Sequence, residues 1–222
     1  SFTAPGAGAR ASLSAKPAPI GAGGVASSTA TANATVGAYN VSASANGATP
    51  TLSYALTNAG ADLSIDDVSV TETNAGSSNA VFTVTRNNSL TAFSVPYSIT
   101  AGTAQAGSDY TPTSGTLNFA VGGPLTQTIS VPVVGDLIVE ATETATLNLG
   151  TVTNTVGVTT VIDGSGLLTI NDNDSAVVTF NPASVSQTEA TSPMAFTVTL
   201  SNPVQSGVTL TLNSATGTAT AA

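Results

Sequence analysis

The chain has 222 residues, of which 41 % are hydrophobic and 7 % charged, and it contains no cysteine and no histidine. This hydrophobic content is enough for buried cores, whereas the missing residue types exclude disulfides and remove the usual ligands of zinc. Twelve acidic residues against three basic ones give a net charge of −9, which excludes nucleic acid and anionic lipid as partners. No apolar run reaches the roughly 18 residues of a membrane span, so we expect no membrane insertion within this segment.

Residues 1–61 form a first zone without acidic residues. Residues 1–30 are rich in Ala, Gly and Ser and have the composition of a flexible linker. Two later runs, residues 39–43 and 52–56, alternate apolar and polar side chains. The zone is therefore predicted to be a loop followed by two or three strands.

Residues 62–174 form a second zone that holds eleven of the twelve acidic residues. Seven short alternating runs, separated by turn residues, occur within roughly a hundred residues. This pattern and the abundance of β-branched residues predict an all-β fold without helix, a two-sheet antiparallel Greek-key sandwich of the immunoglobulin-like kind. The side chains expected to point into its core are Phe82, Val84, Tyr97, Phe119, Val131, Leu147 and Ile170.

Residues 175–222 repeat the beginning of the second zone. The motif Val-Ser-x-Thr-Glu ends at Glu72 and again at Glu189, and in both copies Phe-Thr-Val-Thr follows after a turn. The second copy ends before the equivalent of Asp109, so it is predicted to lack about half its strands. We expect its apolar faces to be covered either by further residues of a longer polypeptide or by strands from a neighbouring subunit.

The second zone combines several short motifs. They are Glu72 at the end of a strand, Phe82-x-Val84, Gly102-Thr103-Ala104, Gly107-Ser108-Asp109-Tyr110, Gly115-Thr116-Leu117-x-Phe119, Glu140-x-x-Glu143 and Ile170-Asn171-Asp172-Asn173-Asp174. Through this combination residues 62–174 resemble a complete Calx-beta domain, and residues 175–222 resemble the N-terminal part of a second one. The first zone, residues 1–61, resembles the C-terminal part of a bacterial immunoglobulin-like domain through Phe2-Thr3-Ala4-Pro5, Gly37-Ala38-Tyr39-Asn40-Val41 and Leu56-Thr57-Asn58.

The resemblance implies a calcium site, because acids at one end of a Calx-beta sandwich bind Ca²⁺. The matching positions are Glu72, Asp109, Asp136, Glu140, Glu143, Asp172 and Asp174. Calcium prefers six to eight hard oxygen ligands, and a cation offsets the repulsion of converging carboxylates. This sequence has Gly135-Asp136 where the family often has two aspartates, and Asn173 separates the last two acids, which implies fewer or weaker ions.

The same acids have a second interpretation. Asp109 and Asp172 occur in turn sequences, where an aspartate often bonds to its own backbone, and Glu140 and Glu143 would also be acceptable as solvated loop residues. Glu189 has the strand context of a ligand but none of its partners. The acids expected to be plain surface or turn residues are Asp62, Asp66, Asp67 and Asp163.

Enzymatic activity is not predicted. Without His or Cys, a nucleophile would need a lysine or a carboxylate as its base, and Lys16 lies in the low-complexity stretch. Glu140 and Glu143 could imitate a glycosidase pair, but no aromatic sugar platform accompanies them.

The leading functional hypothesis is a structural or adhesive repeat segment of a large bacterial cell-surface or secreted fibre, stabilised by calcium. Its partners would be neighbouring repeats of the same chain or neighbouring subunits of the fibre, and its location extracellular. Two alternatives stay open, a calcium-sensing regulatory module of the kind found in sodium/calcium exchangers, and a non-catalytic spacer of a large secreted enzyme.

Overall fold

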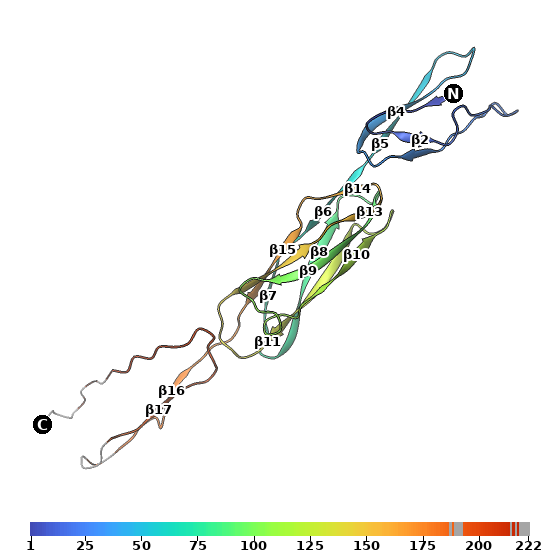
Figure 1. Cartoon of the computed structure of the whole chain (residues 1–222). Coiled ribbons are helices and arrows are strands. Elements are labelled where there is room, and N and C mark those ends of the chain that lie inside the picture. The colour runs from blue at the N-terminus through green and yellow to red at the C-terminus, as the bar shows by residue number, and fades with distance from the viewer. Residues whose placement is uncertain (187, 189–192, 214, 216, 218–222) are drawn as a thin grey trace.

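The computed structural model describes residues 1–186, 188, 193–213, 215 and 217. These residues form strands and no helix, which confirms the predicted all-β class. No helix of the described part is long and apolar enough to cross a membrane. Figure 1 shows three parts in a row, with small N-terminal sheets, a central sandwich and a C-terminal hairpin.

The N-terminal part contains two small sheets. The first has the order β1 (Phe2–Thr3), β4 (Gly37–Ala43) and β5 (Leu52–Asn58), and the second pairs β2 (Ala11–Leu13) with β3 (Ala30–Ala32). The strands predicted over 39–43 and 52–56 are thus confirmed. The linker-like stretch 1–30 is not a simple loop, however, because β1 and β2 lie within it; strands of two or three residues are too short to show an alternating pattern.

The two N-terminal sheets enclose little apolar surface. They border an open groove of about 260 Å³ whose lining includes Phe2, Leu13, Val41, Tyr54 and Leu56. Tyr54 is 71 % exposed. This part therefore leaves apolar side chains uncovered within the described chain.

The central sandwich consists of two sheets. One has the strand order β10 (Ser114–Phe119), β9 (Ala92–Ala101), β12 (Glu143–Leu149), β15 (Ser165–Asn171) and β7 (Val68–Thr71), with β13 (Thr153–Val156) also paired to β9. The other has the order β11 (Thr126–Gly135), β8 (Gly76–Arg86), β6 (Gly60–Ile65) and β14 (Val158–Val161). Only residues 66 and 67 separate β6 from β7, so the chain changes sheets at this point.

Two strand pairs correct the expectation of purely antiparallel sheets. β7 runs parallel to β15, and β6 runs parallel to β14, while the other pairs are antiparallel. An alternating pattern shows which side chains are buried but not the direction of the neighbouring strand. The exposed strands β13 and β14 were not predicted, because neither has a buried side chain that would mark it. The buried strand β6 was also missed, because the boundary between the first two zones was placed within it.

The core of the sandwich confirms the predicted inward side chains. Six of the seven are buried, and Tyr97 is half-buried and packs against the same core. A buried cation was not anticipated there. Arg86 is fully buried, its guanidinium lies 5.2 Å from the centre of the Phe119 ring, and it donates to four main-chain carbonyls, those of Thr91, Ala120, Gly123 and Pro124.

The C-terminal hairpin pairs β16 (Val178–Asn181) with β17 (Thr197–Leu200) antiparallel. Its paired threonines Thr179 and Thr199 lie on one face, and apolar side chains occupy the other. The exposed apolar side chains of this hairpin are Val178, Phe180, Phe196 and Leu200. The pairing is of the same kind as that of β6 with β8, which bury their apolar face in the sandwich core.

Candidate metal centre

The seven acids singled out in the sequence gather at one end of the sandwich. Glu72 directly follows β7, Asp136 follows β11, Glu143 begins β12, and Asp172 follows β15. Within the described residues, two groups have carboxylate oxygens all within 4.8 Å of one another, namely Glu72 with Asp172 and Asp174, and Asp109 with Glu140 and Glu143. Asp136 interacts electrostatically with members of both groups.

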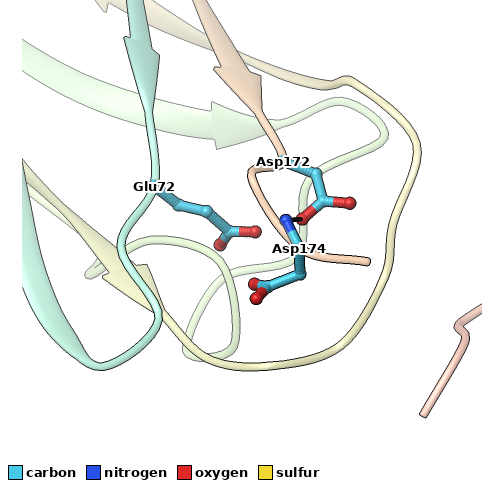
Figure 2. A group of neighbouring side chains, drawn as sticks. All are labelled: Glu72, Asp172 and Asp174. Carbon is cyan, nitrogen blue, oxygen red and sulfur yellow. Dashed lines mark hydrogen bonds between the residues drawn. The ribbon is translucent and has the colours of Figure 1, made fainter. Parts of the chain in front are cut away.

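The first group depends on the parallel pairing of β7 with β15. Thr71 lies opposite Asn171 in this pair. The next residues, Glu72 and Asp172, therefore follow the two strands side by side at the same end of the sheet. Figure 2 shows these two side chains and Asp174 directed toward a common space. The first group thus exists because β7 and β15 are parallel, and the sequence pattern did not reveal this direction.

Hydrogen bonds fix the loop that carries Asp172. Its Oδ1 accepts from the backbone N–H of Asp174 at 2.8 Å, and its Oδ2 accepts from that of Glu140 at 2.9 Å. Asp174 Oδ1 in turn accepts from the side-chain amide of Asn74 at 2.9 Å. Asp172 thus has the local turn bonding of the second interpretation, and at the same time it lies among the clustered acids.

Two carboxylate oxygens of the first group have no partner. Glu72 is only 4 % exposed, and its Oε1 is buried without a hydrogen bond, as is Oδ2 of Asp174. Buried polar atoms normally find partners, and a buried ionised carboxylate without one is costly. These oxygens therefore point to a missing positive charge.

The second group connects the sandwich to the C-terminal part. Asp109 is buried and accepts from the backbone N–H of Gln105 at 2.6 Å, and Glu143 is buried with Oε2 unpartnered. The side-chain amide of Gln205 donates to Oε1 of Glu140 and to Oε1 of Glu143, each at 3.0 Å. Sequence reasoning missed Gln205, because nothing in its local sequence indicates a contact with a loop of the preceding zone.

Burial and mutual repulsion raise the pKa values of these acids. Burial raises the pKa of Glu72 to about 7, with Asp172 and two further acids adding to the effect. Burial likewise raises the pKa of Glu140 to about 7, followed by the charges of Asp109, Glu143 and others. The pKa of Glu143 is also raised, by burial first and then by Asp109.

No basic side chain relieves this repulsion among the described residues. Arg10 and Lys16 belong to the N-terminal part, and Arg86 donates to carbonyl groups instead. Clustered, partly desolvated carboxylates that lack a cationic partner fit a hard divalent cation, which binds oxygen ligands and supplies the compensating charge. The donor set therefore fits calcium.

Gly135 explains one departure from the family pattern. A Cβ atom at this position would overlap the backbone carbonyl and hydroxyl oxygens of Thr73. The loop after β7 thus lies against the end of β11, and this close approach leaves room only for glycine. Asp136 therefore has no acidic neighbour at position 135, and its Oδ1 accepts from the backbone N–H of Ile138 at 2.7 Å.

The acids expected to be surface or turn residues are exposed. Asp66 Oδ1 accepts from the backbone N–H of Thr83 in β8, and Asp67 Oδ1 accepts from that of Leu167 in β15. Asp62 bonds to the Asn87 side chain, and Asp163 to the backbone of Ser165. Glu189, the isolated acid of the third zone, lies outside the described residues.

Comparison with known proteins gives a family match for most of the chain. The model of the Calx-beta domain matches residues 62–174 and 171–222. The crystal structure of the apo-form Calx CBD1 domain is similar at 23 % identity, covering 51 % of this chain and 98 % of that chain with a TM-score of 0.45. CBD12 from CALX1.2 is similar at 23 % identity, covering 51 % and 46 % of the two chains with a TM-score of 0.44. The comparison with curated proteins gave no match.

Proposed function

The chain belongs to the Calx-beta domain family, whose members bind calcium, and we propose that it is a calcium-stabilised repeat segment of a large bacterial cell-surface or secreted fibre. In this proposal the segment is structural or adhesive and catalyses no reaction. Calcium binds at the acidic end of the sandwich. The fibre is extracellular, and its repeats contact one another in one chain or between subunits.

The observation that carries the calcium site is the pair of acidic groups with buried, unpartnered oxygens. Glu72, Asp172 and Asp174 would hold one ion, and Asp109, Glu140 and Glu143 a second. Asp136 lies within electrostatic reach of both groups. A bound calcium ion supplies the positive charge that these carboxylates lack, so binding stabilises the folded domain.

The arrangement of the parts supports the fibre role. The three parts follow one another in a row (Figure 1), and the family match continues into residues 171–222. The hairpin β16–β17 repeats the pairing of β6 with β8, which is expected if residues 175–222 are the N-terminal part of a second sandwich. We interpret residues 1–61 as the C-terminal part of a bacterial immunoglobulin-like domain.

A calcium-sensing module is the second candidate. The contact of Gln205 with Glu140 and Glu143 favours it, because a change at the acidic group would act directly on the following segment. A spacer in a secreted enzyme would use the same stabilisation. The flanking sequence distinguishes these settings, through further repeats or an anchor for a fibre, transmembrane helices for an exchanger and a catalytic domain for an enzyme.

Thermal unfolding with and without calcium tests the proposed site. Binding adds about RT ln(1 + [L]/Kd), roughly 1.4 kcal/mol when free calcium is ten times Kd, so Tm should rise by several degrees. The variant Asp172→Asn/Asp174→Asn should show a much smaller rise, because it loses two charged ligands while its shape is preserved.

The matched control is Asp66→Asn/Asp67→Asn, which removes the same charge at the beginning of β7 rather than at its end. It should respond to calcium like the unchanged protein. Equal shifts in all three proteins would place the ion elsewhere. No shift in any of them at about 10 mM calcium, well above the Kd of typical extracellular sites, would contradict the proposed function.

A further inference from the structure

The segment after β17 is attached to the acidic end of the sandwich by its backbone. The N–H of Val139 donates to the carbonyl of Pro203 at 3.0 Å, and the N–H of Gln205 donates to the carbonyl of Val139 at 3.1 Å. Val139 and Val204 form a parallel bridge between these bonds. Residues 203–205 are therefore held beside the loop that carries Glu140, independently of any side chain.

The side chain of Gln205 uses this position to reach the second acidic group. Its Nε2 donates to Oε1 of Glu140 and to Oε1 of Glu143, both at 3.0 Å. Glu143 is only 6 % exposed, and its other oxygen, Oε2, is buried without a partner. A neutral amide thus provides partial positive charge to two carboxylates, but it leaves the group incompletely satisfied.

A calcium ion bound to this group would need the oxygens that the Gln205 amide now contacts. The NH₂ end of the amide cannot face a cation, whereas its carbonyl oxygen is one of the ligand types that calcium prefers. Rotation of the terminal amide exchanges the two ends without moving the backbone. The bonds to Val139 keep the residue in place during this exchange.

We propose that Gln205 is a calcium ligand supplied by the following segment, so that the ion at Asp109, Glu140 and Glu143 is held by residues from both sides of the junction. This inference rests on the proposed calcium site and adds a residue outside the complete sandwich to it. Occupancy of the site then fixes the orientation of the C-terminal part relative to the sandwich. Without the ion, the side-chain contribution to the junction is the neutral amide contact alone.

Isothermal titration of the 222-residue chain with calcium tests this role. The variant Gln205→Met keeps the length of the side chain but removes both the oxygen and the NH₂ group. If the amide oxygen is a ligand, the variant should bind calcium at one site at least about tenfold more weakly, since even the loss of an outer-shell partner has an effect of this size. If the NH₂ group merely competes with the ion and leaves, the same variant should bind more tightly, which would overturn the proposal.

Gln127→Met is the matched control, because Gln127 lies near the start of β11, away from its acidic end, and donates to the carbonyl of Asn118. The Gln127→Met variant should bind calcium with the same affinity as the unchanged chain. Calcium binding that is the same in the Gln205→Met variant and the unchanged chain would refute the ligand role and leave the proposed function standing. No binding by the unchanged chain would refute both.

A distance measurement tests the effect on the junction. Because the chain has no cysteine, Asn79→Cys in β8 and Thr199→Cys in β17 allow two spin labels to be attached at exposed positions. Saturating calcium should narrow the distance distribution in the unchanged background but not in the Gln205→Met background. Equal narrowing in both backgrounds would show that Gln205 does not couple the ion to the junction.

Discussion

At the scale of single residues, the acidic end is defined by carboxylate oxygens that are buried without a hydrogen-bond partner. Glu72 follows β7, and Asp172 and Asp174 follow β15, so two loops bring these three carboxylates together. The burial of Glu72 and the unpartnered oxygens of Glu72 and Asp174 depend on how these two loops meet. The raised pKa values follow from that burial, not from residue type.

The raised pKa values predict that the calcium-free protein is less stable at pH 8 than at pH 5. The folded-state pKa of about 7 for Glu72 and for Glu140 exceeds the ordinary 4.5, so the folded state binds more protons than the unfolded state between these values. This contribution is complete below pH 4.5 and is lost as the pH rises through 7. The unfolding free energy in urea with a chelator should fall over this range by roughly 2 kcal/mol for each of these two groups.

Glu72→Gln should weaken this pH dependence and raise the stability of the calcium-free protein at pH 8, because a neutral amide replaces a buried charge. Asp66→Asn, at an exposed turn, should leave the pH dependence of the unfolding free energy unchanged. Saturating calcium should reverse the trend, since protons then compete with the ion. A stability that rises from pH 5 to pH 8 without calcium would contradict the assigned pKa values.

Nothing in the sequence indicated that Arg86 is buried, because an arginine within a strand is usually an exposed polar residue. Arg86→Lys should lower the unfolding free energy by about 3 kcal/mol, because lysine cannot donate to all four carbonyls that the guanidinium satisfies. Urea denaturation measures this loss. The exposed Arg10→Lys is the control and should change stability by less than about 0.5 kcal/mol; equal effects would contradict the assigned role.

At the scale of strands, alternation predicted most of the long buried elements, but the exposed strands and the buried strand β6 were missed. β8 and β11 show several buried positions in alternation, so their inward faces could be read directly. β13 and β14 have no buried side chain, and the direction of β7 relative to β15 leaves no trace in either sequence. The placement of Glu72 beside Asp172 depends on that direction, so the site was predictable as a set of residues but not as a geometry.

The close contact between β11 and the loop after β7 predicts that an aspartate pair cannot be restored here. Gly135→Asp should destabilise the domain by about 2 kcal/mol or more, because the new side chain would overlap Thr73 and separate the two loops. Thermal unfolding in a chelator measures the change. Gly23→Asp, where no atom lies within 4 Å of the added Cβ, should have little effect. If the Gly135→Asp protein is as stable as the original, the loop after β7 can move away from β11 without loss of unfolding free energy, and the prediction is wrong.

At the scale of the whole molecule, the three parts differ in how completely they bury their apolar side chains. The central sandwich has a continuous core, whereas the hairpin β16–β17 presents an apolar face to solvent. β6 and β8 bury the equivalent face because β7, β15 and the other strands of the opposite sheet cover it. The hairpin has no such second sheet among the described residues. The uncovered face is the feature of the chain that most favours contact with other chain segments.

We therefore expect the 222-residue chain to associate with itself in solution through the hairpin face. Phe180→Ser/Phe196→Ser removes the two rings that touch at 5.6 Å between centroids and are each 50 % exposed. Sedimentation velocity over a range of concentrations should show association in the unchanged chain and weaker association in this variant. Leu90→Ser/Val121→Ser removes two exposed apolar side chains from loops of the sandwich and should associate like the unchanged chain. A chain that is monomeric at every concentration, or variants that associate equally, would mean that the hairpin face is not a contact surface between copies.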